Sequence, residues 1–434
     1  MKAGVRLIIN ESEHAPGKGA IFKMKGLEGI KVVELTSYVA GPACPRILGE
    51  MGAEIMKIEP FSGDEQRTQG PGFGMKRNDI EDPAFDMSSM NKNWLSVNLK
   101  HPEGLEFVYK MLESADIVIT SFRDKALVKL GLDYESVSKK FPHIVYGHMR
   151  GYGERGPEKD SKGFDATAYS ARGGLITSFP QKGESPVNIT VAFGDFNASV
   201  ALTAGVLAAL VNRQRTGKGD KVVVNLYHMA VWGMQLAMVS RQVGAEYPRS
   251  RKEVPCPTNN CYKSRDGIWF LICNGNYNKY FDVMFTAFGL SHLVGNKDYD
   301  TLEVIGEHKR TAEVIEMLDK AFAAKNFDEW ETIFKQNEIP YQKCFTVDDV
   351  LGDEEAYAND ILRSVHYEAF GSRVIPTSPI RLKSVGDPEL RISKPIGYHT
   401  HEYMLRYGYS EADIARLEAS GAVKCHQTNG TRHS

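Results

Sequence analysis

The stretch KVVELTSYVAGPACPRILGEMGAEIMKIE, residues 31–59, decides the fold class of this chain. Its opening residues, KVVELT, are rich in apolar and β-branched side chains and predict a strand. A helical pattern follows, with Pro42 near its start and Gly52 at its end, where helices favour these residues. The residues EIMKIE predict a second strand. Strand, helix and strand in this order predict a parallel pair joined by a crossover helix.

The alternation of strands and helices, which starts after Gly26, continues along the chain beyond this unit. Further strands are predicted at WLSVNL, DIVITSF, IVYGHM and DKVVVNL. The stretch HPEGLEFVYKMLESA predicts a helix between the first two, and ASVALTAGVLAALVNRQRTG predicts a buried helix before the last. The predicted fold class is therefore α/β, with a doubly wound parallel sheet in a large domain.

The character of the sequence changes past about residue 245. CYKSRDGIWFLICNG predicts two strands joined by an Asp-Gly turn, and RTAEVIEMLDKAFAAKNFDEWETIFKQNEIP predicts two amphipathic helices, as in a smaller α+β domain. Ser410, with Asp413 three residues later, predicts the start of a C-terminal helix that packs back on the large domain. We expect an N-terminal extension, the first part of the large domain, a linker helix with the small domain, and a return to the large domain, over residues 1–25, 26–226, 227–374 and 375–434.

Composition narrows the classes of partner. The 434 residues include 53 basic and 55 acidic side chains, so the chain lacks the global positive field that nucleic acid or an acidic membrane attracts. The six cysteines show no paired CxxC framework, which favours a reducing cytoplasm. Cys256 and Cys261 lack the further ligands that zinc needs, so no metal site is predicted. No apolar run approaches the ~18 residues of a membrane helix, and we expect a soluble protein.

Gly151, Gly153 and Gly156 have the G-x-G-x-x-G spacing of dinucleotide-binding loops. Such a loop needs its third glycine at the start of a helix, whose amides hold the pyrophosphate. Here PEKDSKG follows instead, which is typical of a turn. The sequence therefore favours a loop after a strand, and no nicotinamide or flavin is expected.

Two acids follow the predicted strands. The glycine loop brings Lys162, Phe164 and Asp165 to the carboxyl end of the sheet, where open α/β folds bind their ligands. Asp195, in VAFGDFNAS, is predicted at a helix entrance after an apolar strand, with Gly194 leaving room for a ligand. First-turn amides would point towards an oxyanion formed beside Asp195. The residue type alone favours an ordinary helix cap for either acid, and both interpretations stay open on the residues alone.

Five ordered blocks resemble the family III CoA-transferases. They are LEGIKVVELTSYVAGPACPRILGEMGAEIMKIEPFSGD, NKNWLSVNLKHPEG, ADIVITSFRDKALVKLGLDYESV, GYGERGPEKDSKGFD and AFGDFNAS with the helix and strand after it. The resemblance implies a large domain built from both chain ends, a small central domain and two chains interlocked as a homodimer. It implies no tightly bound cofactor, with a CoA thioester and a small carboxylic acid as substrates. It also implies that Asp195 is the nucleophile, passing through an aspartyl anhydride and an aspartyl-CoA thioester, with Asp165 at the family's second acidic position.

Matching the family's motifs residue by residue implies where CoA lies. Lysine and arginine side chains suit its phosphates, and small residues let the backbone approach. The implied contacts are Val39, Ala40, Val97, Asn98, Leu99, Lys100, Ser121, Phe122, Arg123, Lys129, Lys162, Gly163 and Phe164.

The sequence most resembles the branch that moves CoA between 2-enoyl or aryl-acrylyl thioesters and (R)-2-hydroxy acids. Alternatives are a 2-methylacyl-CoA racemase or epimerase and a catalytically silent CoA-binding protein. The racemase branch has a His before the first acid, where this chain has Phe164. The formyl-CoA branch has a four-glycine run that this chain lacks, so formate and oxalate are not expected substrates. An apolar acyl pocket could be formed by Tyr38, Phe164, Tyr169, Met229 and Trp232, which could equally be core residues.

Overall fold

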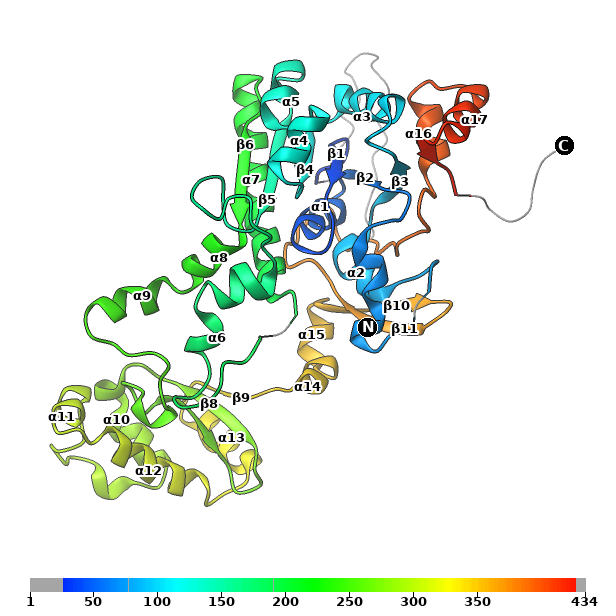
Figure 1. Cartoon of the computed structure of the whole chain (residues 1–434). Coiled ribbons are helices and arrows are strands. Elements are labelled where there is room, and N and C mark those ends of the chain that lie inside the picture. Colours follow the sequence, from blue (N-terminus) through cyan, green and yellow to red (C-terminus); the bar gives the residue numbers. More distant parts are fainter. Residues whose placement is uncertain (1–25, 77, 190, 427–434) are drawn as a thin grey trace, which may run out of the picture.

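The structure is a computed structural model that describes residues 26–76, 78–189 and 191–426. The expected N-terminal extension, 1–25, lies outside the described residues. The larger part of the chain is a mixed α/β unit around one seven-stranded sheet, which confirms the predicted fold class at this level (Figure 1).

The strand order of this sheet is β12-β3-β2-β1-β4-β5-β6. Strands β1 to β6 pair in parallel, and the short C-terminal strand β12 pairs with β3 in the antiparallel sense. The strands are β1 Lys31–Leu35, β2 Glu54–Glu59, β3 Asn93–Val97, β4 Ile117–Thr120, β5 Val145–Arg150, β6 Lys221–Asn225 and β12 Val423–Lys424. The order reverses between β1 and β4, because β2 and β3 lie on one side of β1 and β4 to β6 on the other.

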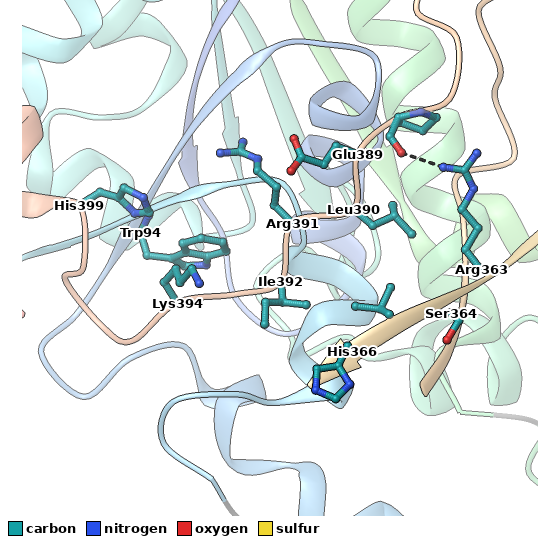
Figure 2. Close-up of a pocket in the computed structure, with 12 residues that line it drawn as sticks. Trp94, Arg363, Ser364, His366, Glu389, Leu390, Arg391, Ile392, Lys394 and His399 are labelled. Atoms are coloured by element: carbon teal, nitrogen blue, oxygen red, sulfur yellow. Dashed lines mark hydrogen bonds between the residues drawn. The ribbon is translucent and has the colours of Figure 1, made fainter. Parts of the chain in front are cut away.

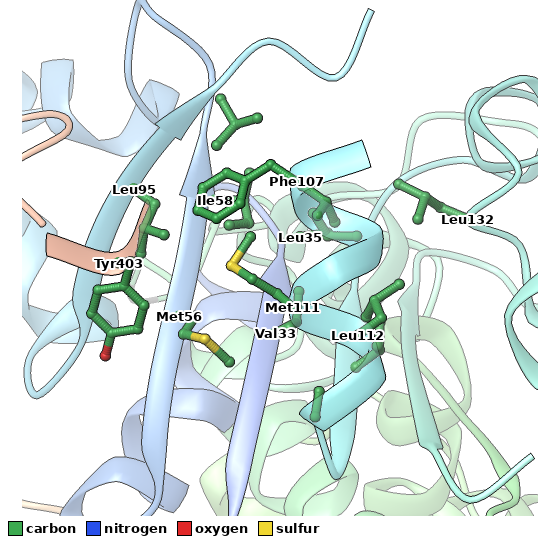
Figure 3. Packing of buried hydrophobic residues seen from close by; sticks show 14 of the residues in the cluster. Val33, Leu35, Met56, Ile58, Leu95, Phe107, Met111, Leu112, Leu132 and Tyr403 are labelled. Carbon is green, nitrogen blue, oxygen red and sulfur yellow. The ribbon is translucent and has the colours of Figure 1, made fainter. Parts of the chain in front are cut away.

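Helices cover both faces of the sheet. Its strands alternate their side chains, so that Val33 and Leu35 enter one apolar layer while Val32 enters the other. On the first face Phe107, Met111 and Tyr403 belong to one buried apolar cluster (Figure 3). The helices of the first face are α3 Pro102–Ser114, α4 Asp124–Leu130, α5 Tyr134–Lys140, α16 Thr400–Arg406 and α17 Glu411–Ala419. Those of the second are α1 Ala40–Glu50, α6 Leu175–Ser178, α7 Phe193–Thr216 and α8 Leu226–Gly233.

Helix α7 fills the second face. It is the one helix among the described residues that is long and apolar enough to cross a bilayer by length and composition. Here it packs against α1 and strands β5 and β6, with Leu202 and Val206 fully buried. The apolar strand expected before Asp195 is wrong: residues 185–189 are irregular, and a turn at 191–192 leads directly into α7. The residues are polar and proline-containing up to Val187, so they lack the alternation that would bury one face of a strand.

A second, antiparallel sheet, of order β7-β8-β9, lies apart from the large one (Figure 1). Its Asp-Gly turn joins β7 and β8 as the sequence predicts, and Phe270, Phe322 and Trp330 lie in its aromatic core. The strands are β7 Asn259–Lys263, β8 Trp269–Cys273 and β9 Tyr341–Lys343. The main helices around them are α10 Tyr277–Ala287, α11 Leu302–Glu307, α12 Thr311–Phe322 and α13 Phe327–Gln336. Helix α9, Gln235–Gln242, precedes this part of the chain.

The hairpin of β10, Leu362–Tyr367, and β11, Gly371–Pro376, falls within the segment expected to form the small domain. It packs instead against α2, Pro83–Ser89, where Tyr367 Oη donates to Asp86 Oδ2 at 2.8 Å. Two short helices, α14 Val347–Leu351 and α15 Glu354–Ala358, precede it. Tyr367 and Ile375 are buried beside Met90, so the hairpin joins the elements around the large sheet. The chain thus contacts these elements before residue 375.

Candidate active site

Three neighbouring strands end at one cavity. The loops after β1 and β4 and the end of β5 surround a volume of about 340 Å³. This is the position where the strand order reverses, and adjacent loops there leave in opposite directions and open a crevice. Open α/β sheets bind their ligands in such crevices, so the fold itself places a site here.

This switch-point cavity collects most of the residues that the sequence implicates around the reacting group. Its lining includes Ala40, Ser121, Phe122, Arg123, Lys162, Gly163, Phe164 and Asp195. Asp165 and Gly194 lie directly behind Asp195. Val39 does not line the cavity but precedes α1 as its N-terminal flanking residue.

The remaining implied CoA contacts line a second cavity of about 1070 Å³. It lies over the carboxyl ends of β2 and β3 and against α4, and it contains Val97, Asn98, Leu99, Lys100 and Lys129. Phe122 lines both cavities, so the two meet at this residue. An extended ligand with a reactive end beside Asp195 and its remainder along β3 and α4 fits this arrangement.

Asp165 holds the start of the helix that carries Asp195. Helix α7 begins after Ala192, which has a left-handed φ of 60°, and no side chain of its own segment caps it. Asp165 Oδ1 instead accepts from the amide of Gly194 at 2.6 Å and from that of Asp195 at 3.2 Å. These amides have no partner within the helix, and a carboxylate placed there stabilises the helix start.

This geometry corrects two expectations. Asp195 is not a helix cap, because it lies within the first turn of α7. The amides of Gly194 and Asp195 do not face an open oxyanion site, because Asp165 occupies them, and the amide of Phe196 donates to the carbonyl of Ala192 at 3.1 Å. Gly194 is nevertheless required, since a Cβ there would lie 2.2 Å from Tyr169 Cγ and 2.5 Å from Asp165 Oδ1.

The Asp195 carboxyl lines the switch-point cavity and differs from Asp165 in its partners. Among the residues that the structure describes, none donates a hydrogen bond to it. Burial, and after it the charge of Asp165, raise the pKa of Asp195 to about 7. Burial also raises the pKa of Asp165, although the α7 amides act in the opposite direction. An ordinary pKa near 4 for Asp195, which its residue type would give, is therefore wrong for this site.

The glycine loop runs from the end of β5 to Asp165 without a helix after Gly156, as the sequence predicts. Arg150, at the end of β5, fixes the loop: its guanidinium donates to the carbonyls of Gly153 at 2.9 Å and Lys159 at 3.2 Å and to Asp124 at 2.5 Å. Sequence reasoning missed Met149, Arg150, Lys159, Ser161 and Leu226 as lining residues. Position along the predicted strand could have identified Arg150, since it ends a parallel strand at the edge of the sheet where ligands bind.

The five candidate acyl-pocket residues do not converge in the structure. Tyr38 and Phe164 contact each other edge to face at 5.6 Å, and both line the switch-point cavity. Tyr169 is buried behind Gly194, Met229 packs against the core of the second face, and Trp232 is 62% exposed on α8. Only Tyr38 and Phe164 of these residues therefore remain candidates to contact an acyl group.

A third cavity, of about 620 Å³, lies elsewhere, between the start of β3 and the hairpin β10–β11 (Figure 2). Trp94, His366, Arg391, Lys394 and His399 are among its lining residues, and none of the sequence-predicted site residues is. Across residues 26–76, 78–189 and 191–426, no group of His, Cys, Asp and Glu side chains could hold a metal ion.

Comparisons with known proteins show the family of this chain. The sequence model of CoA-transferase family III matches residues 27–400. The chain is 37% identical to (R)-2-hydroxy-4-methylpentanoate CoA-transferase of Clostridioides difficile over 92% of this chain and 99% of that protein. It is 38% identical to cinnamoyl-CoA:phenyllactate CoA-transferase of Clostridium sporogenes over 90% of this chain and 95% of that protein.

Solved structures share the fold. The Rv3272 protein of Mycobacterium tuberculosis superimposes with a TM-score of 0.74 at 23% identity, over 88% of this chain and 99% of that one. A CAIB/BAIF family protein of Brucella suis gives 0.71 at 24% identity, over 88% and 100%. From the family match along most of its length and from these two CoA-transferase relatives, we conclude that this chain belongs to CoA-transferase family III and is an enzyme that transfers CoA.

Proposed function

We propose that Asp195 is the nucleophile through which this enzyme passes CoA from an acyl-CoA to a carboxylic acid. One observation carries the proposal: a carboxyl without a hydrogen-bond donor of its own lines the cavity at the switch point of the sheet. A carboxylate that is buried and poorly solvated is more reactive than one in water, and a pKa of about 7 leaves a large fraction ionised at neutral pH.

The steps balance without an external reactant. An Asp195 oxygen attacks the thioester carbon, and the carbon–sulfur bond breaks. The CoA thiolate departs, and an acyl anhydride remains on Asp195. The thiolate attacks the Asp195 carbonyl, releases the first acid and leaves an aspartyl-CoA thioester. The carboxylate of the acceptor acid attacks this thioester, the carbon–sulfur bond breaks to release the CoA thiolate, and a new anhydride joins the acceptor to Asp195. The thiolate then attacks the acceptor's acyl carbon, which gives the new acyl-CoA and free Asp195.

We place CoA across the two cavities that meet at Phe122. Arg123, Lys159 and Lys162 bring positive charge to the switch-point cavity, while Lys100 and Lys129 bring it to the larger one. Such side chains favour the phosphates of CoA and, near the reacting group, its thiolate. The apolar lining of the larger cavity, with Val97, Leu99 and Leu105, suits the less polar parts of the molecule.

The acceptor that we propose is an (R)-2-hydroxy acid, with a 2-enoyl or aryl-acrylyl thioester as donor. The support is the two relatives above, whose names specify a branched hydroxy acid and phenyllactate. The edge-to-face pair of Tyr38 and Phe164 supplies apolar surface at the cavity for such an acyl group. We also propose a cytoplasmic location, consistent with six free cysteines.

A racemase would need a base beside the thioester, and the nearby histidine is unsuited to that role. His148 Nε2 lies 2.9 Å from the carbonyl oxygen of Phe122, and burial lowers the pKa of His148 to about 4. An imidazole held in this way is neutral and engaged with the backbone. The residue before Asp165 is Phe164, which carries no base at all.

The nucleophile is tested by Asp195→Ala. We expect CoA exchange between an acyl-CoA and a labelled acid to fall by at least about a thousandfold, because the covalent route is lost. Mass spectrometry of the wild-type enzyme, trapped with acyl-CoA, should locate the adduct on the peptide containing Asp195. Asp328→Ala, which removes an exposed first-turn carboxyl of α13, is the matched control and should retain full activity. Intact turnover in Asp195→Ala, or an adduct on another residue, would refute the assignment.

The substrate class is tested with a panel of acceptor acids at one fixed acyl-CoA. We expect phenyllactate and 2-hydroxyisocaproate to give the highest kcat/KM, with formate and oxalate at least about tenfold lower, since each lacks the apolar group that the pocket would desolvate. The reverse ranking would contradict the proposed branch while leaving the role of Asp195 intact.

A further inference from the structure

We infer that Glu34, Lys57 and Lys92 are positioning residues that hold residues 36–42 in the conformation that forms one wall of the switch-point cavity. Ser37, Tyr38, Ala40 and Gly41 of this segment line the cavity opposite the glycine loop. The inference rests on the proposed function for its kinetic consequences, but its structural claim stands independently.

The three side chains form a buried ion cluster below the segment. Glu34 comes from β1, Lys57 from β2, and Lys92 from the residue before β3, and each is 0% exposed. Lys57 Nζ lies 2.9 Å from Glu34 Oε1, and Lys92 Nζ lies 2.9 Å from Glu34 Oε2. Lys57 Nζ also lies 2.8 Å from Asp64 Oδ2, so two ammonium groups face two carboxylates.

The same groups bind the segment at several points. Lys57 Nζ donates to the carbonyl of Thr36 at 3.1 Å, and Lys92 Nζ donates to that of Pro42 at 2.8 Å. Glu34 Oε1 accepts from Thr36 Oγ1 at 2.7 Å, and Asp64 Oδ1 accepts from the amide of Tyr38 at 3.0 Å. The two ends of the segment are thus each bonded to a lysine, and both lysines share Glu34.

The segment needs such support because its backbone is unfavourable. Tyr38 has a φ of 65°, a left-handed conformation that a bulky side chain rarely adopts. Gly41 is packed so closely that a Cβ would lie 2.9 Å from Thr36 Cβ. Strained residues of this kind persist where surrounding contacts fix them, and they concentrate at binding sites.

A purely stabilising role does not explain the cluster. Buried ion pairs gain little over well-packed apolar side chains, because removing the charges from water offsets their attraction. Apolar residues at positions 57 and 92 could not donate to the carbonyls of Thr36 and Pro42, and one at position 34 could not accept from the Thr36 hydroxyl. What the charges provide is a fixed geometry for the cavity wall.

The test is the double substitution Glu34→Gln with Lys92→Met, which removes one charge of each sign and leaves the Lys57–Asp64 pair. We expect KM for acyl-CoA to rise at least about tenfold, with a smaller change in kcat. The control is Arg46→Met with Glu50→Gln, which removes another buried ion pair, of 2.8 Å, on α1. Arg46 donates to the carbonyls of Met87 and Pro376, away from the cavity, so we expect this variant to keep the wild-type KM even if its Tm falls.

Amide hydrogen exchange in the free enzyme decides the structural claim without reference to activity. Exchange over residues 37–41 should accelerate at least about tenfold in the double variant and stay unchanged in the control. Thr36→Val removes only the hydroxyl bond to Glu34 and should give a smaller change of the same kind if the double variant does not fold. Unchanged exchange and unchanged KM would overturn the inference, whereas a wild-type enzyme without CoA exchange would instead refute the proposed function.

Discussion

At the scale of single residues, the chemistry depends on two carboxyl groups with different partners. Asp165 accepts hydrogen bonds from the amides of Gly194 and Asp195. The Asp195 carboxyl is desolvated and lies near the negative charge of Asp165, and it accepts no hydrogen bond from the described residues. Burial disfavours the charged form of each, and the amides partly offset this for Asp165 alone. The environment therefore gives two identical side chains different partners, with Asp165 bonded to the α7 amides and Asp195 without a donor in the described part of the chain.

The pH dependence of the first half-reaction follows from this arrangement. Because the pKa of Asp195 is raised to about 7 and only its ionised form attacks, kcat/KM for acyl-CoA should fall about tenfold per pH unit below 7 and level off above it. Asp165→Asn keeps an oxygen for the α7 amides but removes the negative charge, so the midpoint should move to lower pH. It should remain above the usual value of Asp, since burial is the larger cause. The rate of CoA release before the steady state, measured against pH, gives this midpoint. A midpoint that stays in place or moves to higher pH in Asp165→Asn would contradict the assignment of the titration to Asp195.

At the scale of elements, the glycine loop is shaped by contact between two backbones. A Cβ on Gly151 would lie 2.6 Å from the Cα of Gly163, and a Cβ on Gly163 would lie 2.4 Å from the Cα of Gly151. The end of β5 and the approach to Asp165 touch here with no room for a side chain. This contact, and the bonds of Arg150 to two loop carbonyls, bring Lys162 and Phe164 to the cavity.

Gly163→Ala should therefore displace the loop while the sheet stays intact. We expect kcat/KM for acyl-CoA to fall at least about tenfold, because misplacing a binding loop by even ~1 Å can cost about a hundredfold. Gly72→Ala is the control, since an added Cβ there has nothing within 4 Å. Circular dichroism spectra should match between the two variants. Equal kcat/KM values would then show that the backbone contact does not affect activity.

At the scale of the whole molecule, helix α9 and its flanking residues expose several large apolar side chains in the single chain. Helix α9 has no buried residue, with Leu236 77% exposed and Val239 60% exposed. Trp232, on the preceding helix α8, and Val243, directly after α9, are also largely exposed. Large exposed apolar surfaces often lie at contacts with another chain, and the family resemblance implies an interlocked homodimer.

We therefore expect a solution mass of two chains by light scattering coupled to size-exclusion chromatography. Leu236→Lys with Val239→Lys places two charges on the exposed face of α9 and should reduce the dimeric fraction severalfold, with the remainder monomeric or aggregated. A wild-type mass of one chain would refute the dimer. A fully dimeric double variant would show that the partner chain contacts other surfaces.

The sequence by itself determined the α/β class and most local elements, except the strand expected before Asp195, and it pointed to the principal acid only through the family resemblance. Strands and helices follow from the spacing of apolar residues along the sequence, as in β1 and α3. The five ordered motifs point to Asp195 because a motif is defined by residues that are neighbours in sequence. Only the tertiary structure decided what surrounds that acid. The bond between Asp165 and the amides of α7, the contact of Gly151 with Gly163, and the reach of Lys92 to Pro42 join residues far apart along the chain. Periodicity and short motifs record neighbours in sequence, whereas burial and hydrogen bonding, which set the pKa of Asp195 and the shape of its cavity, depend on neighbours in space.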